Sequence, residues 1–77
     1  MPHVEIKCFS GRTAEQKHIC AERVADVIAE TLGCKKSSVS VAIKDIPEEE
    51  WKISVWDKHI VPDKEYLYKE PGYSCDN

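Results

Sequence analysis

The segment GRTAEQK, residues 11–17, decides the fold because it joins an alternating stretch of sequence to a helical one. Gly11 supplies the flexible point of a turn. The Thr13 hydroxyl and the Gln16 side chain match a capping box, in which they satisfy backbone amides that the first turn of a helix leaves unpaired. Apolar residues then recur at helical spacing until Gly33, which predicts a helix of about 18 residues. Its expected apolar face comprises Cys20, Val24, Val27, Ile28 and Leu32.

The residues on both sides of this helix predict β-strands. Residues 3–9 alternate between apolar and more polar side chains, and residues 39–46 alternate in the same way. Two strands joined by a helix of this length are parallel, and the crossover between them is right-handed. The expected fold class is therefore α+β. A βαβ unit with parallel strands occupies residues 2–46, a C-terminal extension occupies residues 47–77, and the two form a single domain.

The extension is less regular than the βαβ unit. Pro47 followed by three glutamates is typical of a helix start, whereas the run WKISVW at residues 51–56 fits neither a helix nor a strand clearly. Pro62 begins a predicted turn or short helix that extends to Lys69 and ends before Pro71. Because this segment holds both tryptophans and all three tyrosines, we expect it to cover an apolar surface.

The chain is short for a stable domain. Domains of about this size often depend on disulfides, a metal ion or oligomerisation. The four cysteines contain no C-x-x-C pair, and the three histidines complete no zinc-binding spacing with them, so no metal site is expected. A single βαβ unit also leaves strand edges unpaired. Two copies would form a four-stranded sheet with two helices on one face, and we accordingly predict a homodimer.

The composition disfavours several functional classes. Hydrophobic residues make up 42% of the chain and charged residues 32%, which is typical of a globular protein. The net charge of −3 argues against nucleic-acid binding, which requires basic surfaces. No apolar run approaches the roughly 20 residues that cross a bilayer, so no membrane association is expected. Residues 1–30 lack a signal-peptide pattern, which predicts a cytoplasmic protein.

Pro2 carries the most distinctive chemistry of the chain. If Met1 is removed, Pro2 presents a secondary amine, a base that no internal residue can offer. An α-amino group has a pKa of about 7.7–8.0 and the amine of proline is more basic, so catalysis near neutrality requires an apolar environment or nearby positive charge that lowers the pKa. The alternative is that Pro2 is merely tolerated at the frayed start of a strand.

Several features together resemble the 4-oxalocrotonate tautomerase family. They are a proline directly after Met1, a strand, the segment G-R-x-x-E-Q-K at residues 11–17, a helix, and the motif S-V-x-V at residues 38–41. The resemblance extends over about residues 2–56 in register. The opening PHVEIKCF and the later PGYS also resemble a longer, dimeric branch of that family, in which a C-terminal extension replaces part of the hexamer packing of the shorter members.

The resemblance implies a cofactor-free keto–enol tautomerase. Pro2 is then expected to act as general base and general acid, moving a proton between the enol oxygen and a carbon of a 2-hydroxydienoate or enolpyruvate. By the same resemblance, Arg12 would hold a substrate carboxylate through paired hydrogen bonds. Phe9 and Trp51 would form apolar walls of the substrate site, and Trp51 stands where the shorter members carry a phenylalanine.

Ser40 departs from the pattern of the founding members, which carry a second arginine at this position of the S-V-x-V strand. A serine offers one neutral hydrogen bond instead of a charge, and Lys44 on the same strand face is an alternative cation. We therefore retain Ser40 as a substrate-binding candidate, although a serine in a strand can also be simple filler. The expected small-molecule partner is a monocarboxylate enol or keto acid with an aryl or alkyl tail.

Two other classes of function fit the same residues. One is hydration or dehalogenation of an unsaturated acid, with Pro2 protonating carbon while a carboxylate activates water. The other is a non-catalytic dimer that binds an apolar ligand or a protein partner. The residues themselves also have plainer interpretations, with Arg12 and His3 as solvated side chains and Trp51 as part of a packed core.

Overall fold

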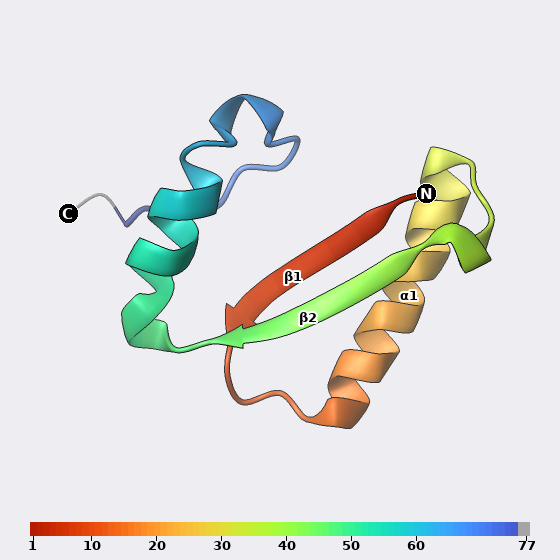
Figure 1. Cartoon of the computed structure of the whole chain (residues 1–77), viewed down its shortest axis with the longest axis horizontal. Coiled ribbons are helices and arrows are strands. Elements are labelled where there is room, and N and C mark those ends of the chain that lie inside the picture. The colour runs from red at the N-terminus through yellow and green to blue at the C-terminus, as the bar shows by residue number, and fades with distance from the viewer. Residues whose placement is uncertain (76–77) are drawn as a thin grey trace. The chain divides into compact units, whose positions relative to one another are not determined.

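The computed structural model describes residues 1–75 of the chain. They form two compact units, of which the first is Met1–Asp45 and the second begins at Ile46. The first unit contains two strands, a long helix and a short 3₁₀ turn, and the second contains three short helical segments (Figure 1). In chain order the elements are β1 (His3–Phe9), α1 (Ala14–Leu32), η1 (Lys36–Ser38), β2 (Ser40–Ile46), η2 (Glu48–Glu50), η3 (Lys52–Ile60) and η4 (Lys64–Tyr66).

β1 and β2 form a two-stranded sheet. Both strands run in the same direction, with α1 as their connection (Figure 1). At the start of the sheet the Ser40 amide donates a hydrogen bond to the Pro2 carbonyl oxygen over 3.2 Å. The predicted βαβ unit with parallel strands is therefore confirmed. β2 begins one residue later than predicted, because the Val39 amide bonds to the Lys36 carbonyl in the preceding turn.

Both predicted ends of α1 are confirmed. The Gln16 amide donates to Thr13 Oγ1 over 3.1 Å, and the Thr13 amide donates to Gln16 Oε1 over 2.8 Å, which completes the capping box. At the other end Gly33 has a φ of 71°, a left-handed conformation that favours glycine, and its amide bonds to the Ala29 carbonyl. These local groups fix where the helix starts and stops.

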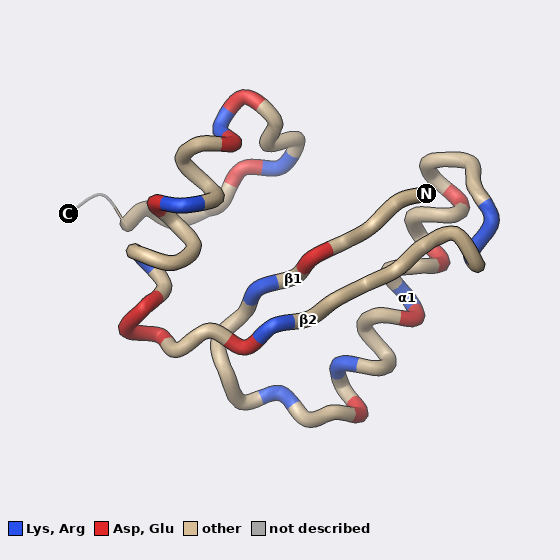
Figure 2. Tube along the Cα trace, viewed as in Figure 1, with Lys and Arg blue, Asp and Glu red and all other residues tan. Residues whose placement is uncertain are grey.

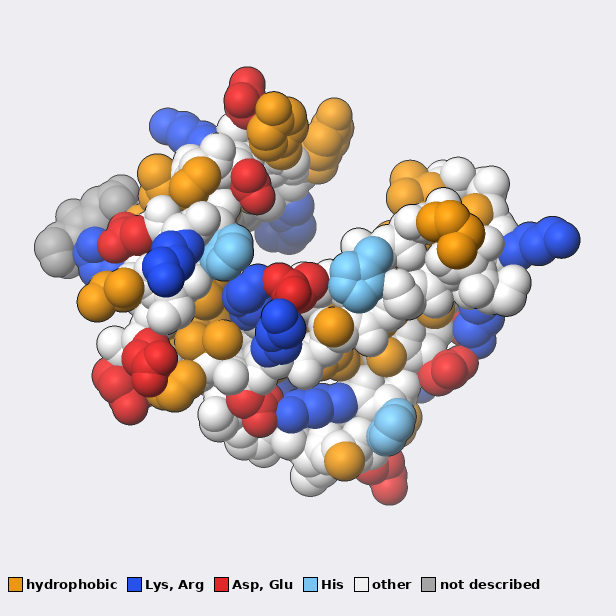
Figure 3. Space-filling model, in the orientation of Figure 1, with side chains coloured by type: hydrophobic (Ala, Val, Ile, Leu, Met, Phe, Trp, Pro, Cys, Tyr) orange, Lys and Arg blue, Asp and Glu red, His pale blue; other side chains and the backbone are white. Residues whose placement is uncertain are grey.

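α1 buries only part of its apolar surface. Ala25 is buried, whereas Val24 and Ile28 are half-buried. Val27 and Leu32 are 54% and 67% exposed and Cys20 is exposed as well, so a single chain leaves these members of the expected apolar face uncovered. A two-stranded sheet is too narrow to cover the whole apolar stripe of a long helix. Hydrophobic side chains therefore reach the surface in several places (Figure 3), and Val24, Val27 and Ile28 line an open groove along α1.

η3 provides the core of the second unit. Its backbone is wound as a π-helix, in which an amide bonds to the carbonyl five residues earlier, as the Val61 amide does to the Trp56 carbonyl over 2.9 Å. The sequence gives no clear prediction for residues 51–56, and in the structure these residues are helical. Val55 and Trp56 are buried, with 5% and 6% of their surface exposed.

Tyr73 joins the two tryptophans of the second unit. Its hydroxyl oxygen accepts a hydrogen bond from Trp51 Nε1 over 3.1 Å. Its ring centroid lies 5.4 Å from that of Trp56, with the ring planes inclined by 46°. A single tyrosine thus contacts both tryptophans of this unit, one through a hydrogen bond and the other through its ring.

We expect Trp56→Ala to destabilise the second unit by about 3–5 kcal/mol, the usual cost of removing a buried tryptophan. The measurement is hydrogen exchange, in which the amides of η3 should lose protection. Tyr68→Ala is the matched control, because the Tyr68 side chain is 101% exposed. Equal losses of protection in the two variants would contradict the assignment of Trp56 to the core of this unit.

The cysteines do not crosslink the chain. All four are free thiols: Cys8, Cys20, Cys34 and Cys75. Within residues 1–75, no group of three or more His, Cys, Asp or Glu side chains is placed to hold a metal ion. Over the same residues, no helix combines the length and the apolar character needed to cross a bilayer.

Candidate active site

The start of the sheet brings Pro2, His3 and Ser40 together. Pro2 is half-buried, and its carbonyl oxygen accepts the hydrogen bond from the Ser40 amide. The Ser40 and His3 side chains lie on the same side of the sheet, with Ser40 Oγ 2.6 Å from His3 Nδ1. Parallel pairing of the strands thus makes neighbours of residues that are 37 positions apart. Of the predicted site residues, Pro2 and Ser40 are close together in one chain.

Arg12 and Phe9 lie at the opposite end of β1. Arg12 Nη1 donates a hydrogen bond to the Phe9 carbonyl oxygen over 3.0 Å, and both residues are exposed. β1 contains 7 residues. A strand rises about 3.3 Å per residue, so Pro2 and Phe9 are separated by on the order of 20 Å. Within one chain, Arg12 and Phe9 therefore do not contact a small substrate held at Pro2.

Trp51 belongs to the second unit, where it is half-buried. Its indole N–H donates to the Tyr73 hydroxyl. The N–H is the only strong hydrogen-bonding group of an indole, so Trp51 can offer a ligand only an apolar surface. Tyr73 was not among the predicted site residues. In the sequence Tyr73 is distinguished by its position in the PGYS stretch, but that stretch does not indicate a contact with a tryptophan.

Charged residues of the strands gather away from the Pro2 end of the sheet (Figure 2). Glu5 is paired with Lys7 and with Lys44, whose ammonium lies 2.9 Å from the Glu5 carboxylate. Hydrogen bonds from Lys7 and then from Lys44 lower the pKa of Glu5 to about 2. Lys44 follows Ser40 along β2 at a distance of about 13 Å, estimated from the rise per strand residue. Lys44 therefore pairs with Glu5 instead of supplying a positive charge beside Ser40.

We expect Glu5 to titrate near pH 2, well below its ordinary value of 4.5. Because the pKa is lower in the folded chain, the pairing favours the folded state above about pH 4.5, and this contribution is lost as the pH falls toward 2. Lys7→Ala should raise the pKa of Glu5 toward 4.5, with Lys44→Ala having a smaller effect, as measured by carboxyl NMR. Lys64→Ala is the control, and an ordinary Glu5 pKa in the unmodified chain would contradict the pairing.

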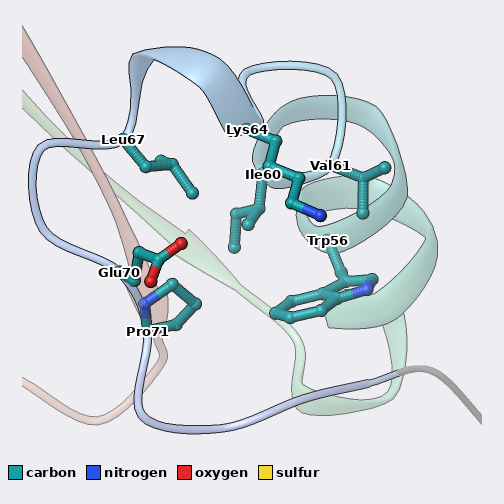
Figure 4. A pocket seen from close by; sticks show the side chains of 7 residues that line it. All are labelled: Trp56, Ile60, Val61, Lys64, Leu67, Glu70 and Pro71. Atoms are coloured by element: carbon teal, nitrogen blue, oxygen red, sulfur yellow. The ribbon is translucent and has the colours of Figure 1, made fainter.

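Each unit also contains a hollow. One of about 200 Å³ lies between the sheet and the start of α1. Another, of about 340 Å³, lies in the second unit, where Trp56, Ile60 and Leu67 point toward the space and the charged groups of Lys64 and Glu70 lie on opposite sides of it (Figure 4). Its size is at the lower end of the range for small-molecule sites. Pro2 lines neither of these two hollows.

The chain is similar to known tautomerases. The family model for tautomerase enzymes matches residues 2–58. The tautomerase PptA of Enterobacter sp. (strain 638) is 48% identical over 75 residues, which cover 96% of this chain and 99% of that protein. The tautomerase PptA proteins of Escherichia coli O139:H28 (strain E24377A / ETEC) and Escherichia coli O157:H7 are each 45% identical over 75 residues, with the same coverage.

Proposed function

The chain belongs to the 4-oxalocrotonate tautomerase family, and from this premise we propose that it catalyses keto–enol tautomerisation without a cofactor, using Pro2 as the base. Membership of this family makes the chain an isomerase. The observation that carries the proposal is the position of Pro2, which directly follows Met1 and stands half-buried at the start of the sheet, where Ser40 holds its carbonyl. Removal of Met1 converts the Pro2 nitrogen from an amide into a secondary amine.

The proposed reaction uses this amine twice. In the ketonising direction the neutral Pro2 amine takes the proton of the enol hydroxyl, and the electrons of the O–H bond form the carbonyl double bond. The electrons of the carbon–carbon double bond then take up the proton that Pro2 returns to carbon. The amine ends as it began, and no electron acceptor is required. Pro2 must be neutral at the outset, which partial burial and a nearby positive charge would favour.

We further propose that the complete site is built from two copies of the chain. Because Pro2 and Arg12 lie at opposite ends of β1, a carboxylate bound by Arg12 reaches Pro2 only if Arg12 comes from a second copy. Two copies related by a two-fold axis pair their edge strands in antiparallel fashion. With β1 at the centre, the Pro2 end of one strand then lies beside the Arg12 end of the other, and Phe9 accompanies Arg12 as an apolar wall.

This homodimer also accounts for the apolar surface that a single chain leaves open. Val27 and Leu32 are exposed on α1, and Val27 lines the open groove together with Val24 and Ile28. A four-stranded sheet with two helices on one face sets the two copies of α1 side by side, so that each can cover the groove of the other. The same pairing removes one open edge from each two-stranded sheet.

The proposed substrate is a monocarboxylate enol with an aryl or alkyl tail. One arginine per site can hold one carboxylate in a bidentate manner. Lys44 is paired with Glu5, and Ser40 offers a neutral hydrogen bond where the founding members of the family carry an arginine. Trp51, whose N–H is bonded to Tyr73, would present an apolar face to the tail.

The test is a comparison of phenylenolpyruvate with 2-hydroxymuconate, with ketonisation followed by absorbance. The mass of the protein is measured first, to establish that Met1 is absent. We expect turnover of both compounds, with the higher kcat/KM for phenylenolpyruvate. Halide release or hydration of unsaturated acids without ketonisation would favour the alternative reaction on this scaffold. An absence of all turnover in Met1-free protein would favour a binding module.

A further inference from the structure

His3 and Ser40 form a polar contact directly beside Pro2. Ser40 Oγ and His3 Nδ1 are 2.6 Å apart, well within hydrogen-bonding distance. The Ser40 amide meanwhile holds the Pro2 carbonyl over 3.2 Å. Ser40 therefore touches both of the first two residues of the processed chain, one through its backbone and the other through its side chain.

The direction of the His3–Ser40 hydrogen bond decides what Ser40 can do. A neutral imidazole carries a proton on only one nitrogen, and a hydroxyl has one proton and two lone pairs. If the Ser40 hydroxyl donates to an unprotonated Nδ1, its one proton forms the hydrogen bond to His3 and cannot bind a third group. If Nδ1–H donates to Ser40 Oγ, the hydroxyl proton is free to point to a third group.

We propose that His3 is a positioning residue for the tautomerase reaction, whose Nδ1–H holds Ser40 so that the Ser40 hydroxyl donates a hydrogen bond to the substrate oxygen that exchanges its proton with Pro2. The inference rests on the function proposed above. That oxygen gains negative charge when Pro2 removes the enol proton, and a donor fixed in advance stabilises such charge. A hydroxyl that accepts an N–H bond is also a stronger donor, because linked hydrogen bonds polarise one another.

Three charged residues of the sheet form ion pairs with one another and not with His3 or Ser40. Glu5 is ion-paired with Lys7 and Lys44. The pair thus gives the chain a neutral donor, set by two side chains, at the position where the founding members of the family carry an arginine. A neutral donor can serve the reacting oxygen without attracting a second carboxylate, which fits a substrate with a single acid group.

Four variants separate positioning from simple packing. Ser40→Ala removes the donor and should lower kcat by about 10- to 100-fold with little change in KM, because the bond strengthens as charge develops. His3→Ala should cause most of the same loss, and the double variant should be no slower than Ser40→Ala. His3→Asn retains an N–H near the Nδ1 position and should restore most of the activity. His18→Ala, at an exposed position on α1, is the control and should match the unmodified enzyme.

A second measurement does not depend on turnover. Nitrogen NMR of the imidazole of Met1-free protein should show His3 protonated at Nδ1, and Ser40→Ala should shift the proton toward Nε2. Losses that multiply in the double variant, an inactive His3→Asn, or a bare Nδ1 in active enzyme would each overturn the role of His3 alone. An inactive unmodified enzyme would instead overturn the proposed function, whatever tautomer His3 shows.

Discussion

Met1-retaining protein is expected to ketonise phenylenolpyruvate about 10²- to 10⁴-fold more slowly than the processed chain, the range that a general base usually contributes. With Met1 in place the Pro2 nitrogen is an amide and cannot accept a proton. Both forms of a 77-residue chain are within reach of chemical synthesis, so they can be compared without relying on cellular processing. Circular dichroism should show the same fold for both, because the Met1 side chain is fully exposed.

The pH dependence of the processed enzyme provides a second view of the same group. Only the neutral amine can take a proton, so kcat/KM should rise with pH through the pKa of the Pro2 amine. Partial burial and Arg12 from a second copy should place this midpoint below that of a free proline amine. Pro2→Ala leaves a primary amine in a more flexible backbone, and its activity should fall between those of the processed and Met1-retaining chains.

Full activity in Met1-retaining protein would remove Pro2 from the mechanism. A reactive acid such as 3-bromopropiolate distinguishes the remaining choices, because it should modify the processed chain at Pro2. Modification at Cys8 or Cys34 would instead point to thiol chemistry. Both are half-buried free thiols, so such a result would be chemically reasonable and would require a different mechanism.

The parts of the fold that the sequence predicts correctly are those encoded by neighbouring residues. The capping box of Thr13 and Gln16 and the left-handed Gly33 are short-range features, and both ends of α1 lie where these residues place them. The alternation of residues 3–9 likewise reflects a property of a single strand, and β1 has the predicted bounds. Such elements can be predicted because interactions between residues close together in the sequence determine them.

The parts that the sequence misses depend on packing between distant residues. Helical spacing assigns Val27 and Leu32 to an apolar face, but it does not reveal how wide a sheet is available to cover them. The packing of Trp56 is another case, because its ring partner Tyr73 lies outside η3. His3 is exposed, as expected for a solvated side chain, but its contact with Ser40 was not foreseen, because only the pairing of parallel strands brings the two residues together.

Unlike these features, the separation of Pro2 from Arg12 is predictable from the sequence, because the length of the strand between them implies it. Both residues were predicted to serve one substrate, yet they lie at the two ends of a strand of 7 residues. A strand of this length spans on the order of 20 Å. A site that uses both residues would therefore require two copies of the chain. The contribution of Arg12 can be tested by substitution and by mixing two different chains.

Arg12→Ala is expected to raise KM for phenylenolpyruvate about 30- to 150-fold while changing kcat little. The carboxylate is present in both the bound substrate and the transition state, so its clamp supplies mostly uniform binding, on the order of 2–3 kcal/mol. Arg12→Lys retains the charge without the planar fork and should have an intermediate effect. Lys35→Ala, at an exposed position before η1, is the control and should leave KM unchanged.

Mixing two impaired chains then tests whether Pro2 and Arg12 of one site come from different copies. The first chain carries Arg12→Ala with a free Pro2, and the second retains Met1 with an intact Arg12. If the chains exchange at random, half of the dimers are mixed, and one of the two sites in each mixed dimer has both an intact amine and an intact guanidinium. Below the KM of the Arg12→Ala chain, the mixture should thus recover about a quarter of the unmodified activity, from parents that are each nearly inactive.

Activity equal to the average of the two parents, with subunit exchange verified by mass spectrometry, would mean that each site takes both residues from one chain. That result cannot be reconciled with a β1 that holds Pro2 and Arg12 at opposite ends.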